Sequence, residues 1–458
     1  MSAVPNPELA AALREPEVLA HGASAGWAAW IAARLGDQEL VIVVAPDEMA
    51  ARRIEDEVRF WRGETEDVAA LPAIDVSPYA DMSPDRTSLV ERMGTLYRLA
   101  TPALRPRVVV TSAEALVRRT LPPAELVQRG MTIAVGDTID REAVTALLVA
   151  GGWTRTPVVD EAGTFAVRGG VIDVFAPLAR YPVRIELFGD DVESLRTFDP
   201  DSQRTLRTVE RLELHPVRET IATGTSEVRA RIRAYADEIA FPSKATRQVI
   251  EQVESGEVFV GIEGLTPAFH DELVAPAAYV PADARWIVID PDACRRTITD
   301  VWIDAEARYR ERVASATSKD RSLAYPPDRH FVDADGAGLG GAGGRRRLML
   351  PTLAVEGTPG THVRVDIDNL SVLKQELDHA RSFGDTEHAQ PLVTAIARWR
   401  RDGLRVVIAC DSQSRIDRLH GVLAARGVEL RLPPPGERPA RDHTDSRSRR
   451  HRSAHRWC

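Results

Sequence analysis

Two runs of consecutive apolar, mostly β-branched residues, Leu40–Ala45 and Val108–Val110, constrain the fold most strongly. A strand in which every residue is apolar is buried on both faces, which is typical of a parallel strand covered by helices. Each run precedes a helical pattern: apolar residues recur at helical spacing from Glu48 to Trp61, and Ser112 can cap a helix after the second run. The alternation of strands and helices predicts an α/β domain with a parallel sheet over residues 1–120.

The pattern changes over residues 121–208. The stretch Gly163–Phe175 reads as a strand, a turn and a second strand. The stretch Val183–Phe188 alternates apolar with charged residues, as an antiparallel strand with one face in water does. Gly189–Asp191 is a turn, after which Val192–Arg196 resumes the strand pattern. We interpret residues 121–208 as a small α+β insert.

Helix-rich α/β sequence returns over residues 209–330, so the first domain continues after the insert. Residues 331–347 contain a stretch rich in Gly and Ala and predict a linker. Residues 348–436 predict a further small α/β domain, in which Leu404–Cys410 is a buried strand. In residues 209–330, the pattern predicts a strand at Trp286–Asp290 and a helix at Ile298–Ser315. In residues 348–436, it predicts helices at Val372–Phe383, Pro391–Arg400 and Ser414–Arg426, the last of which ends at Gly427.

The charge of the chain is distributed unevenly. The 458 residues include 59 Lys and Arg against 68 Asp and Glu, a net charge of -9. Residues 437–458 carry seven Arg and three acidic residues, a net of about +4, which leaves about -13 for the rest of the chain. This charge balance argues against a protein whose whole surface binds nucleic acid, although it leaves room for a local basic face. With three dispersed Cys, no apolar run of about 20 residues and no signal-peptide pattern, the sequence predicts a cytoplasmic protein.

The basic tail, residues 437–458, admits several interpretations. Its sequence resembles an out-of-frame or fragment end, which we favour, but a disordered basic tail that touches nucleic acid is an alternative. Zinc ligation is a weaker alternative, because the ligand types are present without an apolar scaffold around them. The residues concerned are His443, His451, His455 and Cys458.

The segment Gly22–Ala28 occupies the place of a phosphate-binding loop. Such a loop needs a glycine-rich turn, a Lys that reaches the phosphates and a Ser or Thr that holds Mg²⁺. A turn remains between Gly22 and Gly26, but Trp27 stands at the Lys position and Ala28 at the Ser/Thr position. We therefore expect no ATP hydrolysis here. An ordinary strand–helix turn is the alternative interpretation.

No other part of the sequence shows a catalytic or metal-binding pattern. The eleven His residues contain no HExxH motif. Asp290–Pro291–Asp292 follows a predicted strand, but Pro between two acidic residues is more typical of a turn than of a Mg²⁺ site. The sequence predicts neither catalytic residues nor a metal site.

The predicted insert carries a group of arginines with one phenylalanine. Arg168 lies where a strand meets the turn Gly169–Gly170, and the two-residue period places Arg184, Glu186 and Phe188 on one face of a strand. Arg and aromatic residues supply most of the energy at the centre of protein interfaces. These residues can therefore form a protein-binding site. The alternation of apolar and charged residues by itself favours another interpretation, in which Phe188 is a core residue and the arginines are solvated.

From about residue 15 to 435 the chain resembles the N-terminal UvrB-like module of the bacterial transcription-repair coupling factors (Mfd), and more loosely the excision-repair subunit UvrB. The matching residues of the insert are Arg168–Gly169, Asp173, Phe175, Pro182, Arg184, Phe188, Asp190–Asp191, Ser194–Arg196, Phe198–Asp199 and Asp201–Leu206. Those elsewhere are Leu71–Pro72, Pro78–Tyr79, Ser83–Pro84, Arg92, Leu96–Tyr97 and Gly261–Glu263.

The resemblance implies a helicase-like domain that has lost its nucleotide site and is interrupted by an insert that binds UvrA, the damage-recognition subunit. It implies that Arg168, Arg184 and Phe188 carry that contact. In the family, domains missing here bind RNA polymerase and double-stranded DNA, and a motor uses ATP and Mg²⁺. The resemblance therefore implies an adaptor truncated before these domains. A damage-verifying UvrB-like helicase subunit is an alternative, disfavoured by Trp27 and Ala28, and so is a nucleic-acid-binding protein that acts through the tail.

Overall fold

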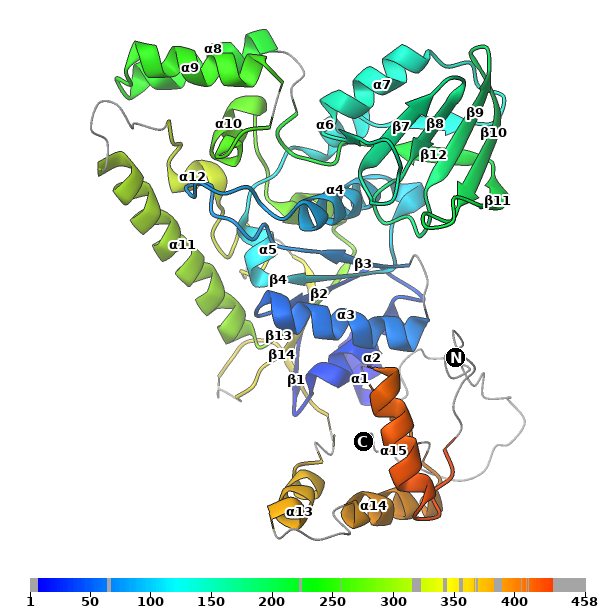
Figure 1. Cartoon of the computed structure of the whole chain (residues 1–458). Helices are drawn as coiled ribbons and strands as arrows, with labels where there is room; N and C mark the ends of the chain where they lie inside the picture. The colour runs from blue at the N-terminus through cyan, green and yellow to red at the C-terminus, as the bar shows by residue number, and fades with distance from the viewer. Residues whose placement is uncertain are drawn as a thin grey trace. The chain divides into compact units, whose positions relative to one another are not determined.

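The structure is a computed structural model (Figure 1). It describes residues 7–63, 67–221, 225–256, 258–314, 323–340, 344–353, 357–365, 367, 370–382, 389–404, 406–408, 410 and 412–430. The chain divides into two compact units, one formed by Met1–Leu19 with Ala25–Val363 and the other by Ala20–Ser24 with Arg364–Cys458. In the described part of the chain, no helix combines the length and the apolar character needed to cross a membrane.

A seven-stranded sheet is the framework of the first domain, with strand order β15-β1-β14-β13-β2-β4-β3. The pairs β1–β14, β14–β13, β13–β2, β2–β4 and β4–β3 are all parallel. Its strands are β1 (Glu17–His21), β2 (Val41–Ala45), β3 (Val68–Leu71), β4 (Val108–Ser112), β13 (Arg285–Ile289), β14 (Arg346–Leu350) and β15 (Thr361–Arg364). Because β13 and β14 lie between β1 and β2, one sheet is built from chain on both sides of the insert, as expected.

Helices cover both faces of this sheet. Helices α2 (Ala25–Leu35) and α3 (Glu48–Arg62) pack on one face, and α4 (Arg86–Ala100), α5 (Ala113–Val117) and α11 (Pro291–Ala314) pack on the other. The strands β2 and β4 are buried along their whole length. The predicted cap is present, since the Ser112 hydroxyl accepts a hydrogen bond from the Ala115 amide (3.1 Å). The fold class and these two strand–helix units are confirmed.

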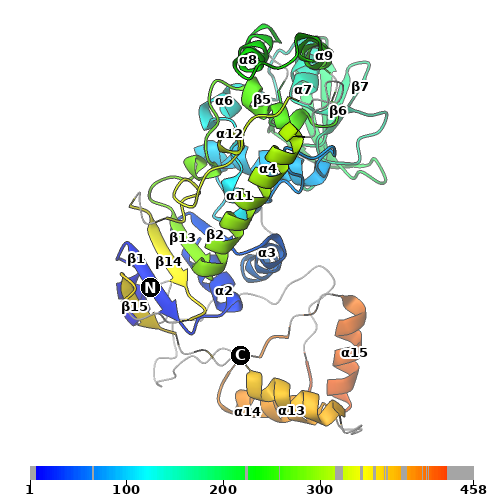
Figure 2. The ribbon, with the colours of Figure 1, turned by 90° about the vertical axis from the view of Figure 1, so that its left-hand side faces the viewer.

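Short helices and one helical subdomain complete the first unit. Helices α8 (Thr225–Glu238) and α9 (Ser243–Glu254) form a pair over α10 (Thr266–Phe269), and α11 runs from the sheet toward this region (Figures 1 and 2). Figure 2 shows α11 as one long helix. The remaining elements are α1 (Pro7–Ala12), α6 (Pro123–Gln128), α12 (Pro327–His330) and the 3-10 turns η1 (Pro102–Leu104), η2 (Ile262–Leu265) and η3 (Pro276–Tyr279).

The insert is a six-stranded sheet, a two-stranded sheet and helix α7 (Arg141–Ala150) (Figure 1). The larger sheet has the order β11-β10-β9-β8-β7-β6, and its strands are β6 (Thr154–Arg155), β7 (Thr164–Arg168), β8 (Val171–Val174), β9 (Val183–Phe188), β10 (Asp191–Phe198) and β11 (Thr205–Val209). The smaller sheet pairs β5 (Met131–Ala134) with β12 (Arg211–Leu214) in antiparallel fashion.

The edges of the insert differ from the predicted 121–208. Because β5 pairs with β12, the insert begins near Met131 and extends at least to Leu214. Leu121 and Leu126, by contrast, are buried in the core of the first domain, and α6 packs against α4. A boundary at 208 falls inside β11.

Helix α4 joins the insert to the first domain. Arg86, Val90 and Gly94 recur every four residues along one side of the helix. Arg86 donates to the Gly163 carbonyl (2.7 Å), and Val90 belongs to the hydrophobic core of the insert. A Cβ at Gly94 would lie only 2.8 Å from the Cβ of Pro177. Helix α4 and the insert therefore pack so closely here that only glycine fits at this position without a shift.

The predicted linker, 331–347, is largely part of the first domain. Phe331, Val332, Ala337 and Leu339 are buried in its core, and β14 begins at Arg346 inside the sheet. The sheet therefore continues past the predicted boundary at 347. The two arginines at the start of β14 form ion pairs: Arg346 with Glu39 (2.6 Å) and Arg347 with Glu17 (3.3 Å).

The described elements of the second unit are mainly helices: α13 (Ser371–Ser382), α14 (Gln390–Arg401) and α15 (Gln413–Ala424). Gly427 has a φ of 77°, and the Val428 amide donates to the Leu423 carbonyl (3.0 Å), which is the predicted left-handed helix end. The predicted strand Leu404–Cys410 is not formed at its described positions, where Val407 is exposed. An apolar run of this length does not distinguish a strand from a packed loop. Residues 437–458 lie outside the described residues.

Candidate functional site

The candidate site is the outer face of the insert's larger sheet, which is the face turned away from its main hydrophobic core. Along β9, Val183 and Ile185 point into that core, and Arg184, Glu186 and Phe188 alternate with them on the outer face. Strand register places these residues in rows. Asp173 of β8 lies beside Arg184, which lies beside Arg196 of β10.

Arg184 is held in place by its neighbours across the sheet. Its Nε and Nη2 donate to the two carboxylate oxygens of Asp173, at 2.7 and 2.9 Å, and its guanidinium lies 4.8 Å from the centroid of the Phe198 ring. Asp173 is only 3% exposed, whereas the Arg184 side chain is 23% exposed. The hydrogen bond to the Asp173 carboxylate raises the pKa of Arg184, against an opposing effect of burial. The cation is therefore fixed in a single orientation with part of it open to solvent.

Phe188 stands at the end of β9 beside the tight turn into β10. This residue is 79% exposed, although an aromatic ring of this size is more often buried. The interpretation of Phe188 as a core residue is therefore wrong, and the alternation correctly predicted its face. An exposed aromatic ring on a rigid hairpin has the properties of an interface anchor.

Arg168 lies in a second hairpin of the same sheet, two strands away from β9. It is the last residue of β7, and its Nη2 donates to the Pro157 carbonyl. The turn after it is fixed from two sides: the Gly170 carbonyl accepts from the Leu187 amide (2.8 Å), and the Gly169 carbonyl accepts from Arg141 of α7 (2.8 Å). Register and these bonds bring Arg168, Arg184 and Phe188 to one face of one sheet.

A second ion pair on the same face was not predicted from the sequence. Arg196 lies 3.3 Å from a carboxylate oxygen of Glu186, and the Ser194 hydroxyl donates to the same oxygen. Asp173 and Phe198 also had no role assigned to them from the sequence. A signal that could have found all of them is charge complementarity between neighbouring strands, once the register of β8, β9 and β10 is known.

The loop at Gly22–Ala28 does not have the shape of a phosphate-binding loop. Helix α2 begins at Ala25, and only three residues separate Gly22 from Gly26, one fewer than such a loop has. A Cβ at Gly22 would lie 2.7 Å from the carbonyl oxygen of Val365, so backbone closely covers this glycine. Trp27 and Ala28 are buried along α2. The residues present do not fit a bound nucleotide and Mg²⁺.

The other predicted turn is a helix cap. Asp290 has a φ of 44°, and its carboxylate accepts hydrogen bonds from the Ala293 amide (3.0 Å) and the Thr352 hydroxyl (2.8 Å). Within the described ranges, no three His, Cys, Asp or Glu side chains are grouped so as to hold a metal ion. The tail residues His443, His451, His455 and Cys458 lie outside those ranges.

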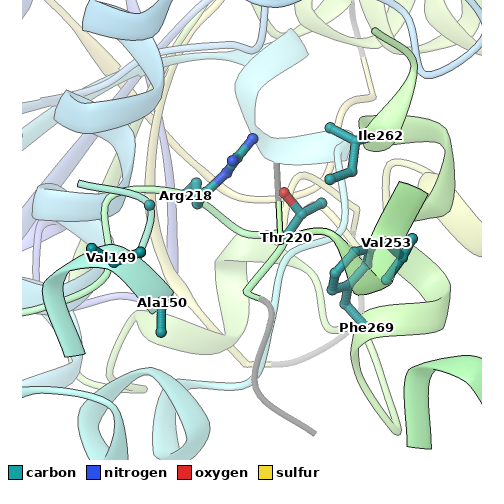
Figure 3. A pocket seen from close by; sticks show the side chains of 9 residues that line it. Val149, Ala150, Arg218, Thr220, Val253, Ile262 and Phe269 are labelled. Atoms are coloured by element: carbon teal, nitrogen blue, oxygen red, sulfur yellow. The ribbon is translucent and has the colours of Figure 1, made fainter. Parts of the chain in front are cut away.

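A pocket near the junction of the insert and the helical subdomain offers no alternative site (Figure 3). It holds about 20 Å³, enough for one water molecule. Its lining includes Arg218, Thr220 and Ile262. A pocket of this size excludes a nucleotide or a comparable organic ligand.

Comparison with known proteins points to the same part of the chain. The sequence profile of the UvrB interaction domain matches residues 131–219, which is the insert as the structure delimits it. A UvrABC system protein B from Thermosipho africanus is 29% identical over 162 residues, which cover 35% of this chain and 24% of that protein. The chain thus contains an α/β domain that is interrupted by a UvrB interaction domain.

Longer matches come from transcription-repair-coupling factors. A transcription-repair-coupling factor from Myxococcus xanthus is 31% identical over 404 residues, covering 86% of this chain and 33% of that protein. The one from Escherichia coli is 27% identical over 374 residues, covering 81% and 32%. The chain is similar to transcription-repair-coupling factors over most of its length, which confirms the resemblance seen in the sequence. It spans about one third of the length of these curated relatives.

The geometry of the site predicts that two substitutions differ in their effect on the free energy of unfolding. Phe188→Ala should change the free energy of unfolding by less than about 0.5 kcal/mol, because the ring is exposed. Arg184→Ala should cost about 2–3 kcal/mol, because it leaves the buried Asp173 carboxylate without its partner. Urea unfolding of each variant measures both.

The double variant Arg184→Ala, Asp173→Asn tests whether the unpaired Asp173 carboxylate causes the loss of stability. A neutral amide is less costly to bury than a carboxylate, so the second substitution should restore part of the lost stability. Equal losses for Phe188→Ala and Arg184→Ala would contradict this description of the face.

Proposed function

We propose that this chain recruits UvrA through the outer face of the insert, in transcription-coupled nucleotide-excision repair. One observation carries the proposal: Phe188, exposed on a hairpin, lies on the same face as two arginines held by the sheet. This face lies in the segment that matches the UvrB interaction domain. Arg168, Arg184 and Phe188 are the proposed contacts.

The chemistry of this face suits a protein partner better than a nucleic acid. The face carries the cations of Arg168, Arg184 and Arg196, and the anions of Asp173 and Glu186 cancel two of them. Nucleic-acid surfaces instead use several uncompensated cations to replace the counterions of phosphates. An exposed aromatic anchor on the same face as fixed guanidinium groups is an arrangement that protein interfaces favour.

We propose further that the chain serves the activity of its family, in which ATP-driven translocation on double-stranded DNA displaces a stalled RNA polymerase. The proposal assigns ATP and Mg²⁺ to the motor of the family and not to the loop Gly22–Ala28 of this chain. The shortened loop, Trp27 and Ala28 support that assignment. They also argue against a UvrB-like helicase, because that enzyme would use this loop for nucleotide.

Phe188→Ala and Arg168→Ala should each weaken binding of UvrA by about 1–3 kcal/mol, because each would remove a central contact. Isothermal titration of UvrA into the 458-residue chain measures the change. Val149→Ala is the matched control, since Val149 is an exposed apolar residue of the insert (57%) on α7. Unchanged affinity for both site variants would contradict the proposed contacts.

ATP turnover by this chain should remain at background in the presence of double-stranded DNA, because the loop provides neither the Lys nor the Ser/Thr that nucleotide hydrolysis requires. The double variant Trp27→Lys, Ala28→Thr should also be inactive, since the loop is still one residue short. A phosphate-release assay tests both. Robust hydrolysis that Trp27→Ala abolishes would contradict the assignment.

A further inference from the structure

The outer face of the insert contains one buried acid, Asp173, which no proposed contact uses. It lies on β8 in the strand row directly beside Arg184 and is 3% exposed. Both of its carboxylate oxygens accept hydrogen bonds from that arginine. A buried carboxylate is costly unless it is paired, so the pair is maintained whenever the sheet is folded.

The pair determines which part of Arg184 remains for a partner. Asp173 occupies Nε and Nη2, and the Phe198 ring lies under the plane of the guanidinium at 4.8 Å. Among the described residues, none accepts a hydrogen bond from Nη1, and the side chain is 23% exposed. The Nη1 amino group of Arg184, with its two N–H bonds, is thus left for an acceptor on a partner, and the guanidinium is held from two sides.

Orientation matters because arginine ordinarily loses much side-chain entropy when it binds. Immobilising a long side chain at an interface costs about 0.5–1.5 kcal/mol, and a side chain that is already fixed avoids that cost. A guanidinium fixed by a bidentate carboxylate also offers a fixed direction to an acceptor, which a solvated arginine does not.

We propose that Asp173 is a positioning residue for partner binding, which fixes Arg184 so that its Nη1 donates to a carboxylate on the partner. The inference rests on the proposed function and extends it by defining the chemistry of the partner surface. That surface carries an acidic side chain opposite Arg184 and an apolar pocket for the Phe188 ring. Asp173 itself touches no partner atom.

A double-mutant cycle with UvrA separates positioning from a general effect on folding. Asp173→Asn keeps the size of the side chain but replaces one acceptor by an amide that cannot accept from Arg184. It should weaken UvrA binding by about five- to tenfold in the otherwise unchanged chain. In the Arg184→Ala background the same substitution should change the affinity by less than about twofold.

Glu213→Gln is the matched control, because Glu213 is a half-buried carboxylate of the insert that is paired with Arg211 on β12. It should leave the affinity unchanged. Phe198→Leu is a second test that keeps the charge pair, and it should weaken binding only when Arg184 is present. Thermal unfolding of every variant establishes that the insert remains folded at the temperature of titration.

The possible results discriminate between the two levels of the proposal. A loss of affinity for Asp173→Asn that is equal in both backgrounds would overturn positioning and indicate a purely structural role. No loss for Asp173→Asn, with Phe188→Ala and Arg184→Ala both weakened, would overturn positioning and leave the proposed function standing. No loss for any of the three would overturn the proposed site itself.

Discussion

The buried side chain of Arg92 connects the parts of the first unit that position the insert. It extends from α4, and its Nη1 donates to the carbonyls of Pro72 after β3 and Ala115 in α5, both at 3.0 Å. Its Nη2 donates to the Arg118 carbonyl (3.2 Å), and its Nε pairs with Glu219 on the chain that leaves the insert (3.3 Å). Because both charged groups are buried, loss of either partner would leave an uncompensated charge in the core.

The position of Arg92 explains how a small insert can present a rigid face. The same helix carries Val90 into the insert core and approaches Pro177 at Gly94. One helix therefore contacts the sheet of the first domain, the exit of the insert and the body of the insert. Rigidity continues to the outer face, where Asp173 and the Phe198 ring fix Arg184. An interface prepared in this way avoids part of the ordering cost of binding.

The sequence correctly predicted those strands and helix ends that depend on a short run of neighbouring residues. The fully apolar runs became β2 and β4, Ser112 became a cap, and Gly427 ended a helix. It did not predict the edges of the insert, because β5 and β12 pair across about 80 residues of chain. The residues of one strand give no indication of which strand it pairs with. The same limit applies to β14, which joins the sheet after a segment rich in Gly and Ala.

At the site, alternation correctly placed Arg184, Glu186 and Phe188 on one face. The alternation could not show whether that face is covered by other parts of the protein. It indicates to which side of the strand each side chain points, and not how deeply the side chain is buried. The family resemblance supplied the choice, and the 79% exposure of Phe188 agrees with it. The role of Asp173 depends on register between β8 and β9, which emerges only when the sheet is assembled.

Hydrogen exchange of the 458-residue chain, with and without UvrA, would locate the surface that UvrA binds. We expect UvrA to slow the exchange of backbone amides at the turn after Arg168 and in the hairpin of β9 and β10, and to leave exchange in α13–α15 unchanged. Protection confined to other parts of the chain, with these two hairpins exchanging as in the free protein, would contradict the assignment of the binding face.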